Sequence, residues 1–332
     1  MKKKVGVIGA GSWGTALSKV LCDNGHAVTL YSAIPSEIEM LQKYREQKEK
    51  LPGVIFPEDT VFTTDIGSAI TGMDLIVLAV PSPFTRSTAV NMSGYVSEGQ
   101  IVVSVAKGLE DVSFDTLSEI IKEEIPQCRV VVMCGPTHAE EVGTGVPTAI
   151  VAGSENSDHA RLVQDVFMNK VLRVYTSDDP YGMELGGALK NVIALAAGIA
   201  DGLGYGDNTK AALITRGIHE IARLGVAAGG KRETFDGLTG IGDLIVTCAS
   251  MHSRNRRAGI LIGKGKTADE AMAEVNQVVE GVYSAKAAKH LAAKYGVDMP
   301  IIDQVNLVLF ENKNPAEALV DLMTRDRKPE VT

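Results

Sequence analysis

This sequence of 332 residues has little of the features that are typical of membrane proteins and of nucleic-acid-binding proteins. The apolar run near residues 193–199 is too short to span a bilayer. Aromatic residues make up only 5% of the chain, and the formal net charge is −8. A chain without an excess of basic charge has no general attraction for nucleic acid or acidic lipid. We therefore expect no nucleic-acid partner and no stable membrane association.

Cysteine is also scarce, and the four thiols show neither a CxxC pair nor the spacing of a zinc site. These residues are Cys22, Cys128, Cys134 and Cys248. No combination of His, Cys, Asp and Glu has metal-ligand spacing, so we expect no metal. The basic start of the chain resembles a signal peptide only briefly, because Gly9 and Gly11 interrupt the apolar run. We expect reduced thiols and a cytoplasmic location.

Short apolar runs alternate with helical patterns over the first half of the chain. Runs typical of buried parallel strands lie at residues 5–8, 27–31, 75–80, 101–105 and 130–133, with further strands expected at 148–152 and 171–175. Helices are expected between them at residues 15–24, 37–50 and 114–125. This alternation predicts an α/β fold with a Rossmann-like, doubly wound parallel sheet.

The pattern changes after about Asp178, where no strand runs of comparable quality follow. Instead, helical periodicity covers residues 183–200, 208–224, 268–275, 285–295 and 300–311. We therefore expect two domains. Residues 1–178 would form a Rossmann-like domain, and residues 179–332 an all-α domain.

The segment GAGSWG at residues 9–14 follows the first predicted strand and opens the first predicted helix. Gly9 would permit the tight turn, Gly11 would let the backbone approach a pyrophosphate, and Gly14 would let the helix pack against the strand. The helix would direct free N–H groups at the phosphates. Ser12 and Trp13 complete the loop, and Trp13 would either contact the cofactor or cover the loop. The context predicts a dinucleotide site.

The sequence leaves the choice between NAD and NADP open. An acidic residue at the end of the second strand binds the ribose hydroxyls of NAD, and an arginine there favours the 2′-phosphate of NADP. Ser32 follows this strand and could bond either form. Lys43 and Arg45 could reach a phosphate, although each is more typical of a surface charge.

Lys190 lies within an apolar helical pattern, where an unpaired lysine is unusual. It is either a snorkelling or interface lysine, or a functional cation. A second cation such as Lys107 would lower its pKa, and a carboxylate such as Asp243 would raise it. Asp243 could alternatively cap a helix that starts after Gly242. Thr247, four residues further on, would share its helix face.

The densest cationic run is Arg254-Asn255-Arg256-Arg257. A phosphate monoester favours a bidentate guanidinium. Since adjacent helical residues cannot all face one pocket, we expect Arg254 to bind an anionic group such as a phosphate, and Arg256 and Arg257 to be structural or at the surface. His138 and His252 are interpreted as positional rather than catalytic.

Seven blocks in order carry a family resemblance over residues 4–325. They are GAGSWG at residues 9–14, VAKG at 105–108, GPTHA at 135–139, LKNV at 189–192, NTKAALITRG at 208–217, GIGDL at 240–244 and HSRNRR at 252–257. The chain resembles bacterial-type NAD(P)-dependent glycerol-3-phosphate dehydrogenase. It departs from the pattern after Tyr31, where many members are basic, and this leaves the preference for NADP in doubt.

The resemblance implies hydride transfer between a nicotinamide and C2 of a three-carbon phosphate. It implies that Lys190 accepts and donates the proton at the C2 oxygen, that Lys107 lies against cofactor and substrate, and that Asp243 orients the lysine. Further substrate contacts are implied for Gly135, Thr137, Asn191, Thr247, Ser253, Arg254 and Asn255. Further cofactor contacts are implied for Ser12, Trp13, Lys107, Ala139, Arg254, Val278 and Glu280.

The resemblance also implies a homodimer that supplies glycerol 3-phosphate for glycerophospholipid synthesis. Two other functions remain as alternatives. A related enzyme acting on a β-hydroxy acid would recognise a carboxylate, which the block around Arg254 disfavours. A dinucleotide-binding redox sensor without catalytic activity would need neither Lys190 nor Asp243.

Overall fold

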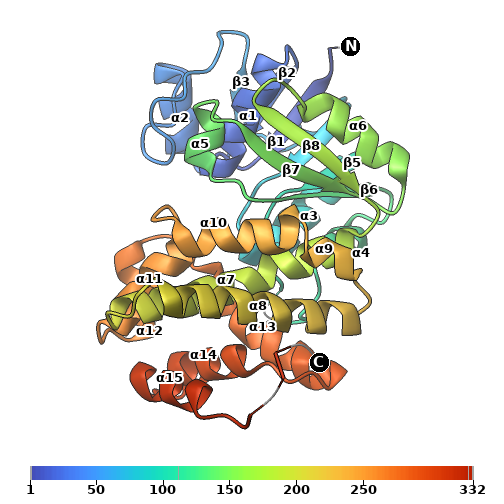
Figure 1. Cartoon of the computed structure of the whole chain (residues 1–332). Coiled ribbons are helices and arrows are strands. Elements are labelled where there is room, and N and C mark those ends of the chain that lie inside the picture. The colour runs from blue at the N-terminus through green and yellow to red at the C-terminus, as the bar shows by residue number, and fades with distance from the viewer. Residues whose placement is uncertain (1, 111, 328, 331–332) are drawn as a thin grey trace.

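The computed structural model describes residues 2–110, 112–327 and 329–330. Met1 and Thr332, the outer limits of the two predicted domains, lie outside the described residues. The eight strands of the described residues all lie before Asp178, and the helices that follow pack together below the sheet in the view of Figure 1. The predicted order of an α/β half followed by an all-α half is confirmed.

One sheet holds all the strands, in the order β3-β2-β1-β4-β5-β6-β7-β8. Their bounds are β1 Lys4–Ile8, β2 Ala27–Tyr31, β3 Val61–Thr63, β4 Leu75–Leu78, β5 Ile101–Ser104, β6 Arg129–Cys134, β7 Thr148–Gly153 and β8 Leu172–Ser177. Order reverses beside β1, which pairs with β2 on one side and β4 on the other. In open α/β sheets, ligands bind at such a switch point.

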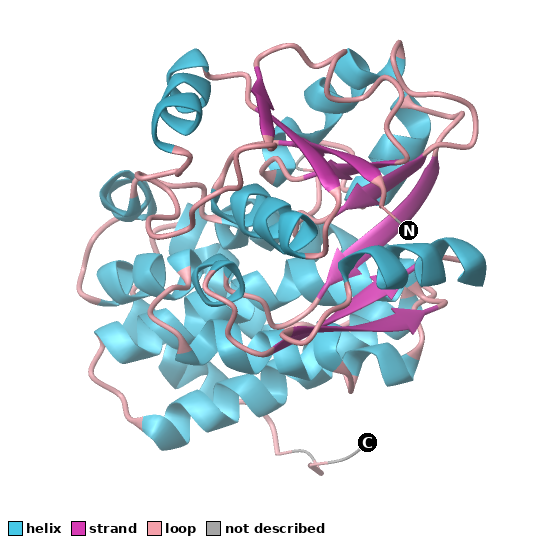
Figure 2. Ribbon diagram, turned by 90° about the horizontal axis from the view of Figure 1, so that it is seen from above, coloured by secondary structure: helices cyan, strands magenta, loops and turns pink. Residues whose placement is uncertain are grey.

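Helices cover both faces of this sheet, as the view from above shows (Figure 2). The helical segments are α1 Ser12–Asp23, α2 Pro35–Tyr44, η1 Ser82–Phe84, α3 Thr85–Ser93, α4 Leu117–Glu124, α5 Ala139–Gly143 and α6 Ser157–Phe167. Successive residues of β4 enter different apolar clusters, Leu75 and Val77 on one face and Ile76 and Leu78 on the other. Burial on both faces explains why these strands read as continuous apolar runs.

Four details differ from the sequence predictions. The pair β6/β7 is antiparallel, because the short α5 packs beside α1 instead of crossing the sheet. The helix expected at residues 37–50 ends at Tyr44, where Arg45 takes a left-handed conformation. The helix expected at 114–125 starts at Leu117, after a capping box on Thr116. Strand β3 and helices α3, α6 and α15 have no counterpart among the predicted ranges.

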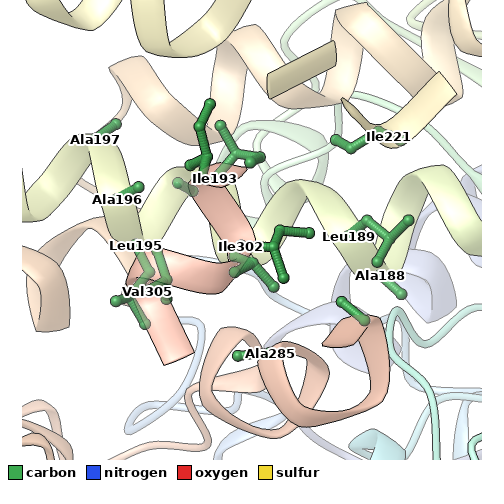
Figure 3. Packing of buried hydrophobic residues seen from close by; sticks show 14 of the residues in the cluster. Ala188, Leu189, Ile193, Leu195, Ala196, Ala197, Ile221, Ala285, Ile302 and Val305 are labelled. Atoms are coloured by element: carbon green, nitrogen blue, oxygen red, sulfur yellow. The ribbon is translucent and has the colours of Figure 1, made fainter. Parts of the chain in front are cut away.

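The second half is built around α7, Pro180–Gly202. The other segments are α8 Asp207–Ala227, α9 Arg232–Phe235, η2 Leu238–Gly242, α10 Asp243–Ala249, α11 Arg254–Gly263, α12 Ala268–Val275, α13 Glu280–Tyr295, α14 Pro300–Phe310 and α15 Pro315–Met323. Figure 3 shows Leu195 of α7 together with Ile302 and Val305 of α14, and all three belong to the same buried cluster. The core of this half therefore lies around α7.

Helix α7 is long and apolar enough to cross a membrane by length and composition. The length argument drawn from residues 193–199 is therefore wrong, because these residues belong to a helix of 23 residues. The apolar window of that helix is completely buried within the fold. Its composition is that of a central helix covered by other helices on every side.

Glycines allow α11 to pack directly on the backbone of α7. A Cβ atom on Gly198 would lie 2.2 Å from the carbonyl oxygen of Arg256, and one on Gly259 would lie 2.2 Å from that of Leu195. No side chain fits at either contact. This close crossing places the start of α11, at Arg254, beside the middle of α7 at Lys190 and Asn191.

Candidate active site

A cavity of about 420 Å³ lies where the carboxyl ends of the strands face the helical half. It joins the glycine loop to residues of α7, α10 and α11, which are far away in the sequence. The predicted site residues that line it are Gly11, Ser12, Trp13, Lys107, Thr137, Ala139, Lys190, Asn191, Asp243, Thr247, Ser253, Arg254, Asn255 and Glu280. One cavity thus holds candidates from both halves of the chain.

The glycine loop has the geometry that a dinucleotide needs. Gly9 has a φ of +119°, which an L side chain rarely adopts, and a Cβ on Gly14 would lie 1.9 Å from the carbonyl oxygen of Gly9. A Cβ on Gly11 would meet no atom within 4 Å. Gly11 precedes α1 and supplies no side-chain cap, so the first N–H groups of α1 are free to face the cavity. These features fit a pyrophosphate at the helix N-terminus.

Lys190 is buried in the cavity wall, and two of its three ammonium hydrogens have partners there. Its Nζ donates to Oδ1 of Asp243 at 2.6 Å and to Oγ1 of Thr247 at 2.6 Å. Thr247 in turn donates to the main-chain carbonyl of Asp243 at 2.6 Å, because the two residues are one turn apart on α10. The ammonium group is therefore held in a fixed direction and does not snorkel to solvent.

Lys107 reaches the same carboxylate from the end of β5. Its Nζ lies 2.7 Å from Oδ2 of Asp243 and donates to the main-chain carbonyl of Gly135 at 2.8 Å. Asp243 is 1% exposed, whereas the side chain of Lys107 is 18% exposed. Because Asp243 contacts both lysines through its two oxygens, it holds the two ammonium groups together and does not serve as a helix cap.

The structure settles the sign of the pKa shift that the sequence left open. Burial, with repulsion from Lys107, lowers the pKa of Lys190 despite the opposing attraction of Asp243. Burial also acts to lower the pKa of Lys107, but attraction to Asp243 outweighs it and raises that pKa. Burial acts to raise the pKa of Asp243, but the two lysines outweigh it and lower that pKa. Lys190 is therefore the better proton donor of the pair.

Two buried asparagines link three helices beside Lys190. The Nδ2 group of Asn255 donates to Oδ1 of Asn191 at 3.0 Å, and Oδ1 of Asn255 accepts from the main-chain N–H of Gly281 at 2.8 Å. Ser253 caps α11, accepting from the main-chain N–H of Arg256 at 3.2 Å. These bonds fix the start of α11 at the cavity wall.

The cationic run on α11 divides between the cavity and the fold. Arg254 is about one-third exposed and pairs with Glu280 at 2.8 Å. Arg256 pairs with Asp201 at 2.7 Å and donates to the carbonyl of Ala249, so its interactions are structural. Arg257 also lines the cavity, and its buried Nε has no partner among the described residues. Residues 254 and 257 share a helix face, and this spacing could have identified Arg257 from the sequence.

His138 and Cys134 lie close to the lysines. Burial, with repulsion from Lys190 and Lys107, lowers the pKa of His138, so the imidazole is neutral near pH 7. Its ring lies 5.6 Å from that of His252, and its buried Nε2 has no partner among the described residues. Burial raises the pKa of Cys134 to about 11, and its Sγ lies 3.8 Å from Oδ2 of Asp243. The thiol therefore stays protonated.

Four predicted residues lie outside the cavity lining. Gly9 and Gly14 shape the loop from behind, and Gly135 accepts the bond from Lys107. Val278 is half-buried and does not line the cavity, although the neighbouring Gln277 does. Lys50 and the strand end at residues 79–81 also line it and were not predicted. Residues 79–81 follow β4, which lies beside the switch point, and this position could have identified them.

No group of three or more His, Cys, Asp or Glu side chains suited to a metal ion occurs in the described part of the chain. The four cysteines, all of which are described, are free.

Comparison with known proteins places the chain among dehydrogenases. Residues 4–160 match the model for the NAD-dependent glycerol-3-phosphate dehydrogenase N-terminus, and residues 179–320 match that for the C-terminus. A glycerol-3-phosphate dehydrogenase (NAD(P)+) of Agathobacter rectalis is 64% identical over 327 residues, which span 98% of this chain and 97% of that one. The one of Fusobacterium nucleatum is 57% identical over 330 residues, spanning 99% and 98%.

A solved structure has the same fold over its full length. The crystal structure of glycerol-3-phosphate dehydrogenase from Coxiella burnetii is 36% identical to this chain, with a TM-score of 0.93. The match covers 98% of this chain and 99% of that one.

Proposed function

Because this chain belongs to the NAD-dependent glycerol-3-phosphate dehydrogenase family, we propose that its cavity interconverts dihydroxyacetone phosphate and sn-glycerol 3-phosphate. The chain is an oxidoreductase that uses NAD or NADP. The observation that carries the assignment of the site is the buried Lys190–Asp243–Lys107 cluster, which opens on the same cavity as the glycine loop.

The dinucleotide would be held by the loop at residues 9–14, with its pyrophosphate on the free N–H groups at the start of α1. When bound, the nicotinamide supplies or accepts the hydride. Trp13 and Ala139 line the cavity, as does Lys107, which shares Asp243 with Lys190. These residues orient the cofactor and exclude water from the reacting carbon.

Lys190 would donate a proton to the C2 oxygen of the ketone during reduction and accept it during oxidation. Negative charge develops on that oxygen as the hydride reaches C2, and a fixed ammonium group stabilises it. The lowered pKa of Lys190 makes it a stronger acid than an exposed lysine, and it brings the neutral form within reach for the reverse direction.

Lys107 and Asp243 would act together with Lys190. Lys107 adds a second positive charge near the C2 oxygen and helps to lower the pKa of Lys190. Asp243 keeps both ammonium groups at fixed positions, 2.7 and 2.6 Å from its oxygens. Thr247 fixes the direction of Lys190 further. The active centre is thus assembled before substrate arrives.

The phosphate of the substrate would bind at the start of α11. Ser253, Arg254 and Asn255 line the cavity here, and the helix N-terminus favours an anion. Arg254 would turn part of its guanidinium from Glu280 to the phosphate, and Glu280 would remain on the cofactor side. Asn191 and Thr137 would complete the pocket around the three-carbon chain.

The experiment that tests this function is a steady-state assay. Purified chain should oxidise NADH or NADPH with dihydroxyacetone phosphate and show no comparable rate with short β-keto acids. A faster reaction with the β-keto acids would favour the carboxylate-specific relative and refute the assignment. Cofactor binding without turnover of either class would favour a redox sensor.

Three further properties belong to this proposal. The division into a cofactor domain at residues 1–178 and a catalytic domain at 179–332 is supported by the end of β8 at Ser177 and the start of α7 at Pro180. A cytoplasmic location without membrane or nucleic-acid association is supported by the net charge of −8 and the burial of α7. A homodimer is what the family resemblance implies. The reaction would supply glycerol 3-phosphate for glycerophospholipid synthesis. Light scattering should give the mass of two chains.

A further inference from the structure

A charged cluster closes the end of β2, where the sequence offers neither the acid nor the arginine that distinguishes NAD from NADP. Ser32 follows the strand, and its hydroxyl donates to Oε2 of Glu37 at 2.6 Å. The other carboxylate oxygen of Glu37 accepts from Nζ of Lys50. Glu37 is 5% exposed. Helix α2 has therefore brought a carboxylate back to the strand end from five residues further along the chain.

This cluster adjoins the proposed cofactor site. Lys50 lines the cavity together with Gly11 and Ser12, and its main-chain carbonyl accepts from the hydroxyl of Ser12 at 2.6 Å. In dinucleotide-binding folds the residue at the end of the second strand meets the adenosine ribose. The ribose would thus lie against Ser32, with Glu37 directly behind it.

The cations near this strand end are engaged elsewhere. Arg45 donates to the carbonyl of Thr60 at 2.9 Å and lies over the ring of Phe62. Lys43 and Lys48 lie over the ring of Tyr44, which is exposed. Lys50 is paired with Glu37. Because Lys50 is paired with Glu37, the two together offer a 2′-phosphate no net positive charge, and the Glu37 carboxylate is the charged group that contacts Ser32.

The charge in the first turn of α2 also disfavours a 2′-phosphate. A helix N-terminus attracts phosphate, but the first turn of α2 holds Glu37. A phosphate brought to this position would meet a fixed negative charge, and juxtaposed like charges weaken binding strongly. A ribose hydroxyl would instead find carboxylate and serine oxygens as acceptors.

We propose that Glu37, supported by Ser32 and Lys50, makes the adenosine end of the site selective for the unphosphorylated ribose, so that the chain prefers NAD(H) to NADP(H). This inference rests on the proposed function and names the residue that decides its cofactor. Lys50 limits the selectivity, because its ammonium group offsets part of the carboxylate charge. The two residues should therefore shift the preference in opposite directions.

Binding of the adenosine half alone isolates this effect from catalysis. Titration of the full chain with ADP and with 2′,5′-ADP by calorimetry compares ligands that differ at the 2′-position. Wild-type protein should bind ADP more tightly, by about tenfold or more. Glu37→Gln, which keeps an oxygen for the Ser32 hydroxyl, should raise the relative affinity for 2′,5′-ADP by about tenfold. Lys50→Gln should lower it.

Glu39→Gln is the matched control, since Glu39 is exposed on the same helix and the variant makes the same change in net charge. It should leave the ratio of the two affinities unchanged. An unchanged ratio in Glu37→Gln, or a wild-type preference for 2′,5′-ADP, would overturn the proposal.

The same samples are assayed with dihydroxyacetone phosphate and each reduced cofactor. Turnover that is faster with NADPH than with NADH at low cofactor concentration would refute the selectivity but leave the proposed function intact. Absence of turnover with both would refute the proposed function, and the ratio of nucleotide affinities would still test the role of Glu37.

Discussion

The two ends of the cavity are built by different means. At the proposed cofactor end, the backbone of the loop at residues 9–14 and the start of α1 form the surface, and glycines supply the space. At the proposed reacting end, charged side chains form the surface. Lys107 comes from the loop after β5, Asp243 from α10 and Lys190 from α7. Lys107 and Asp243 are 136 positions apart in the sequence.

This difference explains how each end tolerates change. A surface formed by the backbone has no room for a side chain. An added methyl group therefore lowers ligand affinity where the ligand must approach, and lowers stability where a neighbouring strand must approach. A charged cluster depends on three groups that stabilise one another, so the loss of one changes the charge and pKa of the others. The predictions below test each end separately.

The largest effect is expected at the reacting end. Lys190→Ala removes the proposed proton donor, and kcat for dihydroxyacetone phosphate should fall by about 10²–10⁴-fold. ADP affinity should stay within about twofold of wild type, because the loop at residues 9–14 is untouched. Lys231→Ala, at an exposed lysine of the same half, is the control. A Lys190→Ala enzyme with full turnover would exclude the mechanism.

At the cofactor end, two glycines three residues apart should respond differently. Gly14→Ala places a methyl group 1.9 Å from the carbonyl oxygen of Gly9, and should lower the free energy of unfolding by about 1–3 kcal/mol. The methyl group of Gly11→Ala meets no atom within 4 Å, so the free energy of unfolding of this variant should lie within about 0.5 kcal/mol of that of wild type.

Gly11→Ala should nevertheless weaken ADP binding by about tenfold, because its methyl group occupies the approach of the pyrophosphate. Thermal melts and calorimetric titrations measure the two quantities on the same samples. Equal ADP affinity in Gly11→Ala and wild type would show that the nucleotide binds elsewhere.

On α11, the two arginines should separate substrate binding from stability. Arg254→Ala should raise KM for dihydroxyacetone phosphate by about 10- to 100-fold, as expected for a charge-assisted hydrogen bond worth roughly 1.5–3 kcal/mol. Arg256→Ala breaks the pair with Asp201 and should lower Tm with little change in KM. Steady-state kinetics and melts check both. A raised KM in Arg256→Ala with a lowered Tm in Arg254→Ala would show that Arg254 does not bind the phosphate.

A further effect, on stability alone, is expected where the α/β half meets the helical half. Glu184 of α7 accepts from the N–H and the hydroxyl of Ser118, in the first turn of α4, at 2.9 and 2.5 Å. Burial raises the pKa of this carboxyl to about 7 from its usual 4.5. The folded chain therefore keeps a proton that the unfolded chain releases, and stability should fall as pH rises from about 5 to about 7.

Glu184→Gln resembles the protonated form and should remove this pH dependence. It should be more stable than wild type at pH 8, by on the order of 1–3 kcal/mol, and equal to it near pH 5. Denaturant unfolding at both values measures the difference, with exposed Glu98→Gln as the control. If the stability of Glu184→Gln and of wild type changed equally between pH 5 and pH 8, this carboxyl would not titrate in that range.

How far the sequence could predict the molecule follows the same division between local and distant contacts. The βαβ unit around Gly9 was predictable because strand, loop and helix are adjacent and have strong patterns. The family resemblance gathered the residues of the reacting end, but residue patterns alone could not decide whether Asp243 caps a helix or binds Lys190. That depends on the packing of α10 against α7.

Other features could not be predicted from the sequence because they depend on contacts between distant residues. The burial of Glu37 depends on where α2 ends, which is set by the left-handed Arg45. The antiparallel β6/β7 pair depends on α5 packing beside α1. The pKa of Lys190 depends on a balance among burial, Lys107 and Asp243 that only their distances define.

A crystal structure of the complex with NAD and sn-glycerol 3-phosphate tests the central claim most directly. We expect the C2 oxygen within about 3.2 Å of Nζ of Lys190, with Lys107 and Asp243 still in contact and the phosphate at the start of α11. A C2 oxygen bonded only to His138, with Lys190 and Lys107 directed away from the substrate, would contradict it.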